Sequence, residues 1–284
     1  MIGIFDSGHG GLTVLQVVAA QFPHLQLVYL GDHGHAPYGN KSAAEVLALT
    51  TAGVETLFQQ GCQLVILACN TATAIAARTL QQDWLPASGW QAKGYKVLGI
   101  VAPTVEAATH TPWAVTTPQY PQKNNTDTML IFGTVRTIES GVYPEEIRKR
   151  CPKITVIQQA CPHLVAAIEG HAPEAEIELL VQDYTHAALK KCAVPPHSAI
   201  LGCTHYPLVE HLFRAHLPAS TRVLSQPTIV AHSLEDYLHR HPQFAQPINP
   251  KLPHIQYLTT GKPAEVTRSL AQFWQGDVID FTHI

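Results

Sequence analysis

Two cysteines, Cys69 and Cys203, stand in closely similar surroundings. Each ends a short apolar run, residues 64–68 or 199–202, and each precedes small hydroxyl or amide residues that could begin a helix. A sulfur just before a helix N-terminus gains from unpaired amide protons and from the helix dipole, and both favour the thiolate. Two thiols facing one carbon could remove a proton from one side and return one on the other. This pair is therefore the candidate catalytic centre.

The other cysteines lack this setting. A free cysteine is most often a small buried hydrophobe, which is the alternative for Cys69 or Cys203 alone, but their matched settings favour catalysis. We interpret the remaining four as structural residues: Cys62, Cys151, Cys161 and Cys192. None of the six has the C-x-x-C spacing of zinc or redox sites, so we expect free thiols.

A glycine-rich turn, residues 6–11, follows the first apolar run of the chain. Its amides could cradle an anion, or it could simply join a strand tightly to a helix, and the sequence leaves both readings open. It lacks the G-x-G-x-x-G pattern, so no nucleotide is inferred. Asp6 begins the turn, and a carboxylate at a strand end could accept or orient a proton beside a thiol.

Histidines raise two further hypotheses. His205 lies two residues after Cys203 and could assist that thiol, although a histidine in a chain with 17 of them is more often a surface or core residue. His33 and His35 have a spacing used in metal sites, but no matching cysteines or carboxylates accompany them. We predict no metal site.

Length and charge exclude several classes of protein. The chain has 284 residues, which suits two modest domains, and its 18 basic residues do not outnumber its 21 acidic ones. No cationic run is longer than residues 148–150, so nucleic acid is not an expected partner. The sequence lacks a secretory leader and any apolar run near the roughly 20 residues of a membrane helix. We expect a soluble, cytoplasmic protein without a membrane partner.

Apolar runs with strand character alternate with longer stretches of helical periodicity. The predicted strands are residues 2–5, 27–30, 64–68, 97–101, 129–132, 154–157, 199–201, 222–224 and 256–258. The predicted helices include residues 43–60, 71–83, 144–149, 174–191 and 263–274. This alternation predicts an α/β fold with parallel sheets covered on both faces. Ligands bind beyond the carboxyl ends of strands in such folds, where Asp6, Cys69 and Cys203 fall.

A weak internal repeat predicts two lobes. Residues 3–8 are echoed by residues 130–134, and the two segments precede Cys69 and Cys203 by similar distances. The two halves of the chain therefore carry related strand and thiol patterns.

Several motifs, spread over nearly the whole chain, together resemble the glutamate racemase family of the aspartate/glutamate racemase superfamily. They are residues 2–8 with 10–14, 29–32 with 37–39, 68–73, 160–162 with Glu169, 201–208 and 259–261. The motif after the second thiol, residues 201–208, is the most specific of them.

The resemblance implies a cofactor-independent racemase that interconverts L- and D-glutamate. Cys69 and Cys203 would flank the α-carbon and alternate as thiolate base and thiol acid. It further implies that Asp6 supports Cys69, that His205 supports Cys203, and that Glu169 assists on the second side.

The resemblance also implies a substrate site. Ser7, Asn70, Thr71 and Thr204 would bind the amino and α-carboxylate groups, and Tyr38 and Gly39 would contact the side-chain carboxylate. Asp6 and His205 complete the set of expected substrate contacts.

The implied fold has two similar parallel-sheet α/β lobes with pseudo-twofold symmetry and the active site between them. One lobe would comprise residues 1–99 with 208–284, and the other residues 100–207. The family further implies a homodimer that supplies D-glutamate for peptidoglycan.

Three segments depart from the family pattern. Residues 33–36 are His-Gly-His-Ala, residues 101–104 differ from the usual family sequence, and residues 111–127 are predicted to form a longer loop. Residues 239–253 are a second predicted loop, rich in proline and histidine. None of these departures removes a thiol or its proposed helper.

Other functions remain open on the sequence. A relative could act on aspartate or another small acid, or could be a decarboxylase or isomerase, although decarboxylase-like relatives need only one of the paired thiols. A protein of another class could form a Cys69–Cys203 disulfide as a redox sensor, or could bind a ligand without catalysis.

Overall fold

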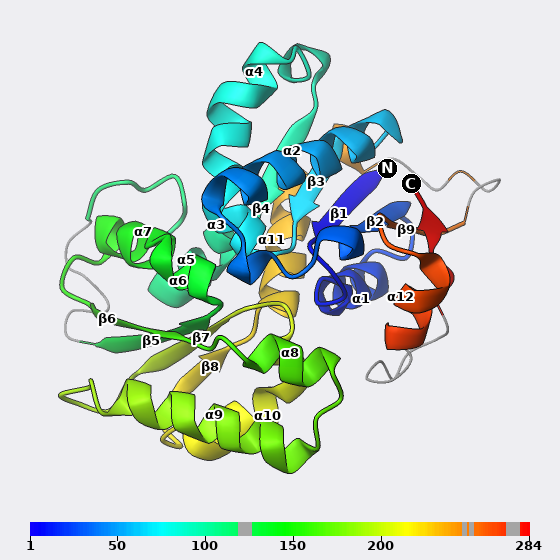
Figure 1. Ribbon diagram of the computed structural model, residues 1–284. Coiled ribbons are helices and arrows are strands. Elements are labelled where there is room, and N and C mark those ends of the chain that lie inside the picture. The colour runs from blue at the N-terminus through cyan, green and yellow to red at the C-terminus, as the bar shows by residue number, and fades with distance from the viewer. Residues whose placement is uncertain (119–126, 246–248, 250–252, 271–278) are drawn as a thin grey trace.

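The computed structural model describes residues 1–118, 127–245, 249, 253–270 and 279–284. Their strands form two sheets in which every pair is parallel, with helices packed on the faces of each sheet (Figure 1). The predicted two-lobed α/β fold is confirmed.

The first sheet has the strand order β10-β9-β2-β1-β3-β4. Its strands are β1 (Ile2–Asp6), β2 (Leu27–Gly31), β3 (Leu64–Leu67), β4 (Lys96–Gly99), β9 (Ile255–Thr259) and β10 (Thr282–His283). The side chains of β1, β2 and β3 are all buried, as expected for parallel strands covered on both faces.

The second sheet repeats the central part of the first. Its strands are β5 (Thr128–Gly133), β6 (Thr155–Ala160), β7 (Ser198–Gly202) and β8 (Arg222–Leu224), in the order β6-β5-β7-β8. Numbered within each half, this is the order of β2-β1-β3-β4. The internal repeat read from the sequence is therefore a repeat of topology.

All nine predicted strands are present, and only the two-residue β10 was missed among the described strands. One part of the predicted division into lobes was wrong. Residues 208–284 were assigned to the first lobe, but β8, Arg222–Leu224, pairs with β7 in the second sheet. A three-residue strand has no sequence signal for the sheet that it joins.

Each face of the first sheet has its own apolar core. One core contains residues of α1 (Leu12–Gln21), α11 (Gln226–Arg240) and α12 (Pro263–Leu270). The other contains residues of α2 (Ala43–Gln59), α3 (Asn70–Thr79) and the short α4 (Leu85–Ala87), which follows a π-helical turn at Leu80–Trp84. We call this sheet and these helices the first lobe.

The second sheet is covered in the same way. Residues of α5 (Val101–Thr109) and α7 (Val142–Arg150) pack on one face, and those of α8 (Leu164–Glu169), α9 (Glu174–Leu189) and α10 (Glu210–His216) on the other. The short α6 (Val135–Glu139) follows β5. We call this sheet and these helices the second lobe. Short 3₁₀ helices lie at His33–His35, Tyr38–Asn40, Gln91–Lys93, Tyr206–Val209 and Pro242–Phe244.

The predicted helices are confirmed with shifted ends. The helix predicted at 71–83 continues into the π turn, and the one predicted at 263–274 is described only to Leu270. Residues 111–118 contain no helix or strand, whereas the rest of that predicted loop up to residue 126 lies outside the described residues. The loop predicted from residue 239 was placed too early, because α11 continues to Arg240.

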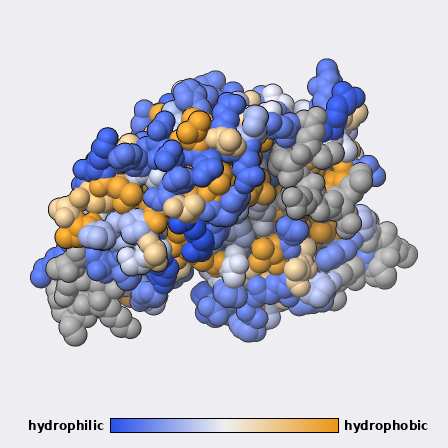
Figure 2. All heavy atoms as spheres, turned by 90° about the horizontal axis from the view of Figure 1, so that it is seen from below, coloured by the Kyte–Doolittle hydropathy of each residue, from blue (hydrophilic) through white to orange (hydrophobic). Residues whose placement is uncertain are grey.

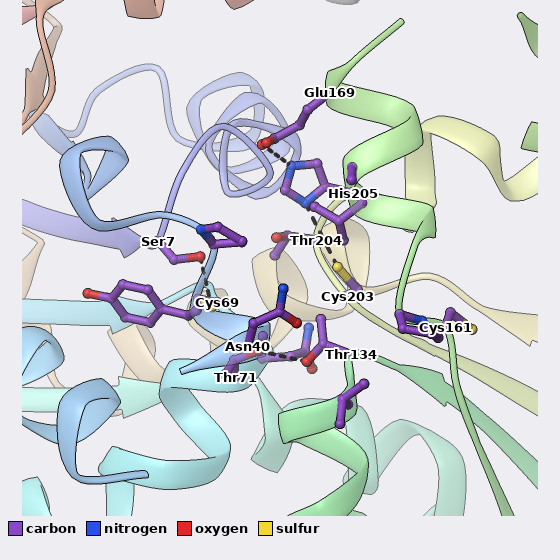
Figure 3. A pocket seen from close by; sticks show the side chains of 18 of the residues that line it. Ser7, Asn40, Cys69, Thr71, Thr134, Cys161, Glu169, Cys203, Thr204 and His205 are labelled. Carbon is purple, nitrogen blue, oxygen red and sulfur yellow. Dashed lines mark hydrogen bonds and ion pairs between the residues drawn. The ribbon is translucent and has the colours of Figure 1, made fainter. Parts of the chain in front are cut away.

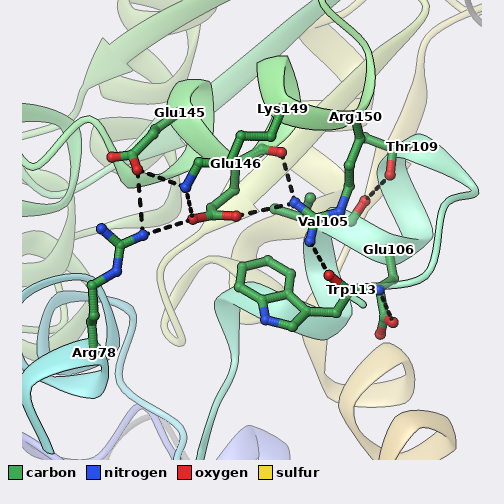
Figure 4. A network of polar contacts seen from close by, with 9 residues as sticks. All are labelled: Arg78, Val105, Glu106, Thr109, Trp113, Glu145, Glu146, Lys149 and Arg150. Carbon is green, nitrogen blue, oxygen red and sulfur yellow. Dashed lines mark hydrogen bonds and ion pairs between the residues drawn. The ribbon is translucent and has the colours of Figure 1, made fainter. Parts of the chain in front are cut away.

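A charged network links α3 of the first lobe to α7 of the second (Figure 4). The Arg78 guanidinium lies 3.0 Å from Glu146 and 3.3 Å from Glu145, and the Lys149 ammonium lies 2.7 Å from both carboxylates. Arg150 is buried, pairs with Glu146 at 3.0 Å and lies over the Trp113 ring. Of the three cations that pair with the buried Glu146, only the exposed Arg78 belongs to the first lobe, and exposed pairs of this kind add little stability.

The surface is mostly hydrophilic on the face drawn in Figure 2, with apolar residues in scattered groups. In the described part of the chain, no helix has both the length and the apolar character needed to cross a membrane.

Candidate active site

A cavity of about 370 Å³ lies between the two lobes, and both Cys69 and Cys203 line it. Cys69 follows β3 and is the N-cap of α3, and Cys203 directly follows β7. Figure 3 places Ser7 and Cys69 on one side and Cys203, His205 and Glu169 on the other. As predicted, the two thiols lie together at the carboxyl ends of strands.

The Cys69 thiol is buried and held by two polar neighbours. The Ala72 N–H donates to its sulfur at 3.4 Å, and the Ser7 hydroxyl lies at 3.4 Å. Burial, followed by the negative charge of Asp6, raises the pKa of Cys69 to about 12, although both hydrogen bonds lower it. Cys69 is therefore a thiol at neutral pH. Its place before a helix does help the thiolate, because the Ala72 N–H lowers this pKa, but burial and Asp6 outweigh the helix end.

Cys203 has a different environment. A 3₁₀ helix, Tyr206–Val209, follows it instead of an α-helix, and the Nδ1 atom of His205 lies 3.8 Å from the sulfur. The Nε2 atom of the same ring lies 2.7 Å from a carboxylate oxygen of Glu169. Because a carboxylate accepts, Nε2 carries a hydrogen and Nδ1 faces the thiol.

Charge stabilises the protonated His205 ring. Burial alone would lower the pKa of His205, but its contacts with Cys203 and Glu169 raise it well above the ordinary value. Burial raises the pKa of Glu169, but hydrogen bonds from His205 and His9 outweigh it and hold this pKa well below the usual range. The Glu169–His205 pair therefore places an ion pair beside the Cys203 sulfur.

Asp6 lies behind the cavity wall. It is fully buried, accepts a hydrogen bond from the Gly8 N–H at 2.9 Å, and accepts another from the Thr204 hydroxyl at 3.2 Å. Burial raises its pKa despite these contacts. Asp6 therefore hydrogen bonds to the segment that carries Cys203, while its charge acts on Cys69.

The cavity brings together every other residue that the sequence predicted for the site. They are Ser7, Tyr38, Gly39, Cys69, Asn70, Thr71, Glu169, Cys203, Thr204 and His205. The Tyr38 hydroxyl donates to Asp32 at 2.5 Å, so its oxygen is engaged away from the thiols. The Thr71 hydroxyl lies 3.0 Å from that of Thr134, across the contact between the lobes.

Several lining residues were missed from the sequence. Thr134 had a usable signal, since it occupies the place of Ser7 in the internal repeat. Cys161 was interpreted as structural only, but it lines the cavity, and burial raises its pKa. Other missed lining residues are Pro37, Asn40, Val135, Pro162, Val165, Ala166, Gly170 and Ser269. The apolar ones among them, such as Val135, Val165 and Ala166, have no local signal that distinguishes them from core residues.

The unusual loop at residues 33–36 borders a histidine cluster near Glu169. The His33 ring lies 4.3 Å from the ring of His9, whose Nδ1 is 3.6 Å from the Glu169 carboxylate. Burial and the proximity of His9 lower the pKa of His33 to about 3, so this ring is neutral. Across the described residues, no three histidines, cysteines or carboxylates are grouped to hold a metal ion.

Comparison with known proteins gives consistent relatives. The chain is 42% identical to glutamate racemase of Phenylobacterium zucineum (strain HLK1) over 278 residues, 97% of each chain. It is 43% identical to glutamate racemase of Paracoccus denitrificans (strain Pd 1222), over 96% of each chain. The crystal structure of glutamate racemase isoform RacE1 from Bacillus anthracis superposes with a TM-score of 0.81 at 29% identity, covering all of this chain and 97% of that one. No family model matches the chain.

The environment of Cys69 predicts opposite effects of two substitutions on its pKa. In a Cys203→Ala background, Asp6→Asn should lower the pKa of Cys69 by removing a negative charge, and Ser7→Ala should raise it by removing a hydrogen bond. Ultraviolet absorbance of the thiolate during a pH titration measures both, and Cys69→Ala identifies the transition. An unchanged or higher pKa in Asp6→Asn would contradict the assignment.

The low pKa of Glu169 predicts a pH-dependent contribution to stability. A depressed carboxylate pKa stabilises the fold fully above the unfolded value of about 4.3, and the contribution is lost as pH falls below it. Glu169→Gln should therefore lower the free energy of unfolding by about 1.5 to 3 kcal/mol at pH 6, with the difference shrinking in acid.

Denaturant unfolding of wild type and Glu169→Gln across this pH range measures the difference. Glu174→Gln is the matched control, because Glu174 pairs with His211 on the exposed surface, where such pairs contribute little. A stability difference for Glu169→Gln that does not change with pH would show that the carboxylate charge is not its source.

Proposed function

The chain belongs to the glutamate racemase family and is an amino-acid racemase, and we propose that it interconverts L- and D-glutamate by proton transfer between Cys69 and Cys203. One observation supports this mechanism above all. The two thiols come from different lobes and line one cavity, so a substrate held between them presents one face of its α-carbon to each.

The two thiols are prepared for opposite parts of the reaction. The Nδ1 atom of His205 lies 3.8 Å from the Cys203 sulfur, so this ring is placed to exchange a proton with Cys203, the proposed base that removes the α-proton. Cys69 has a pKa of about 12 and is a thiol able to donate a proton to the opposite face. After one turnover Cys203 carries the proton and Cys69 is the thiolate. Reaction of the opposite enantiomer then returns both thiols to their starting protonation states.

The difficult step is removal of a weakly acidic α-hydrogen. Negative charge then develops on the α-carbon and its carboxylate, and preorganised donors stabilise it best in a site that excludes water. The hydroxyl and amide groups of Ser7, Asn70, Thr71 and Thr204 line the cavity and are the proposed donors. The burial of both thiols is consistent with a site closed to water.

The proposed substrate contacts divide by charge. Glu169 lines the cavity on the side of Cys203 and supplies negative charge that favours the ammonium group. Asn70 and Thr71 begin α3, where unpaired amides favour the α-carboxylate. Backbone groups near Gly39, with the Tyr38 ring, are the proposed contacts of the side-chain carboxylate.

Further features follow from the family and are part of the proposal. The enzyme needs no cofactor, acts as a homodimer in the cytoplasm and supplies D-glutamate for peptidoglycan. We assign residues 1–99 with 225–284 to one lobe and residues 100–224 to the other, a division supported by the pairing of β8 with β7.

Racemisation in deuterated water tests the activity. Incubation of the pure, reduced protein with L-glutamate should yield D-glutamate labelled at the α-carbon without added pyridoxal phosphate, metal or nucleotide, because the thiols exchange protons with solvent. Chiral chromatography with mass spectrometry measures inversion and labelling together. Aspartate is tested in parallel as the alternative substrate. Absence of both inversion and exchange with glutamate would contradict the proposal.

Removal of each thiol tests the mechanism. Cys69→Ala and Cys203→Ala should each lower kcat/KM by about 10³-fold or more, and equally in both directions, because the enantiomers have equal free energy. Cys192→Ala is the matched control, since Cys192 lies outside the cavity.

An analogue separates the two thiols. Elimination of chloride from 3-chloroglutamate needs only a base that removes the α-proton. Each alanine variant should therefore retain elimination from one enantiomer, and the two variants should prefer opposite enantiomers. Near-normal racemisation in either variant would exclude the two-base mechanism.

A further inference from the structure

A buried polar cluster lies behind the cavity wall, where α3, α5, α7 and α11 approach one another. It consists of Asn70, Thr104, Tyr143 and Gln226, each at most 2% exposed. Of the four, only Asn70 lines the cavity with the thiols. Figure 1 shows α11 running between the two sheets, and it packs against α1 and α5. The cluster thus joins the segment after Cys69 to helices of both lobes.

Hydrogen bonds occupy both lone pairs of the carbonyl oxygen in the Asn70 side chain. The Tyr143 hydroxyl donates to Asn70 Oδ1 at 2.6 Å, and Gln226 Nε2 donates to the same oxygen at 3.0 Å. Asn70 Nδ2 in turn donates to Gln226 Oε1 at 2.6 Å. An amide oxygen has two lone pairs and an amide nitrogen two hydrogens, so both lone pairs are used and one N–H remains.

The orientation of this amide is set from outside the cavity. The Thr104 hydroxyl donates to the Ile100 carbonyl at 2.7 Å, and a carbonyl can only accept. The Thr104 oxygen must therefore accept from Gln226 Nε2, which lies 2.9 Å away. This contact fixes which end of the Gln226 amide is nitrogen, and Gln226 then fixes the Asn70 amide.

Tyr143 belongs to the same hydrogen-bond network. It accepts from Gln226 Nε2 at 2.9 Å, so one hydrogen of that nitrogen is shared between Tyr143 and Asn70 Oδ1. Burial raises the pKa of Tyr143, which keeps its hydroxyl protonated as a donor. A backbone carbonyl between β4 and α5 thus determines the group that Asn70 presents near Cys69.

We propose that Thr104, Gln226 and Tyr143 are positioning residues that hold the Asn70 side chain with only an N–H facing the cavity, so that it receives a carboxylate oxygen of the substrate. The amide lies at the N-terminus of α3, where an anion is also favoured by the helix. An ammonium group is excluded from this position, because no acceptor of Asn70 remains. The inference rests on the proposed function, since it orients glutamate in that site.

Removal of the Thr104 oxygen tests the first link. Thr104→Val should raise KM for glutamate several-fold with a smaller change in kcat, because the Gln226 and Asn70 amides are then free to turn over. Thr104→Ser keeps the hydroxyl and should restore the wild-type KM. Binding of glutarate, a dicarboxylate without an amino group, measured by calorimetry should weaken in parallel with the rise in KM.

Removal of the Gln226 donor tests the second link. Gln226→Glu has nearly the same shape, but a carboxylate oxygen replaces the Nε2 donor to Asn70 Oδ1, so the Asn70 amide loses the contact that fixes its orientation. Glutarate affinity should then fall at least about tenfold. Gln226→Met, which sets no orientation, should fall between Gln226→Glu and wild type. Gln59→Glu, an exposed change on α2, should leave glutarate binding unchanged.

The outcomes separate this inference from the proposed function. Unchanged glutarate affinity in Thr104→Val and Gln226→Glu, with only the melting temperature or kcat reduced, would overturn it. If the Gln226 variants do not fold, Tyr143→Phe deletes a single oxygen and must alone weaken glutarate binding. Calorimetry needs no turnover, so a wild-type protein that binds glutarate but does not racemise glutamate would overturn the proposed function alone.

Discussion

Strand pairing in the two sheets fixes where the thiols lie. Phe5 of β1 is paired with Leu67 of β3, two residues before Cys69, and Phe132 of β5 is paired with Leu201 of β7, two residues before Cys203. A slip of one residue would move a thiol by about 3.3 Å and turn its side chain to the other face of the sheet. Both thiols reach the cavity because both halves keep the same register.

The contact between the lobes is specified by polar groups that cross it near each thiol. Thr71, after Cys69, meets Thr134 of the second lobe, and Thr204, after Cys203, donates to Asp6 of the first. Each of these groups is costly to bury without its partner, so the lobes have a defined relative position. The same crossing places unlike neighbours beside the thiols, a carboxylate near one and an imidazolium near the other.

Much of the fold and the centre of the site could be predicted from the sequence. Parallel strands buried on both faces are continuous apolar runs, so nine strands and the ends that carry Cys69 and Cys203 were recognisable. The sheet joined by β8 and the lining role of Cys161 were not, because they depend on residues distant in the chain. The pKa of Cys69 could not be predicted for the same reason, since burial and the charge of Asp6 arise only in the folded protein.

The shared strand order of the two sheets has a consequence for the ancestry of the chain. Two identical half-chains, related by an exact twofold axis, would place the same helper beside both thiols. Once the halves are joined in one polypeptide, each can change alone, and here one thiol has Ser7 while the other has His205. Covalent fusion thus allows the two thiols that interconvert mirror-image substrates to have chemically different neighbours.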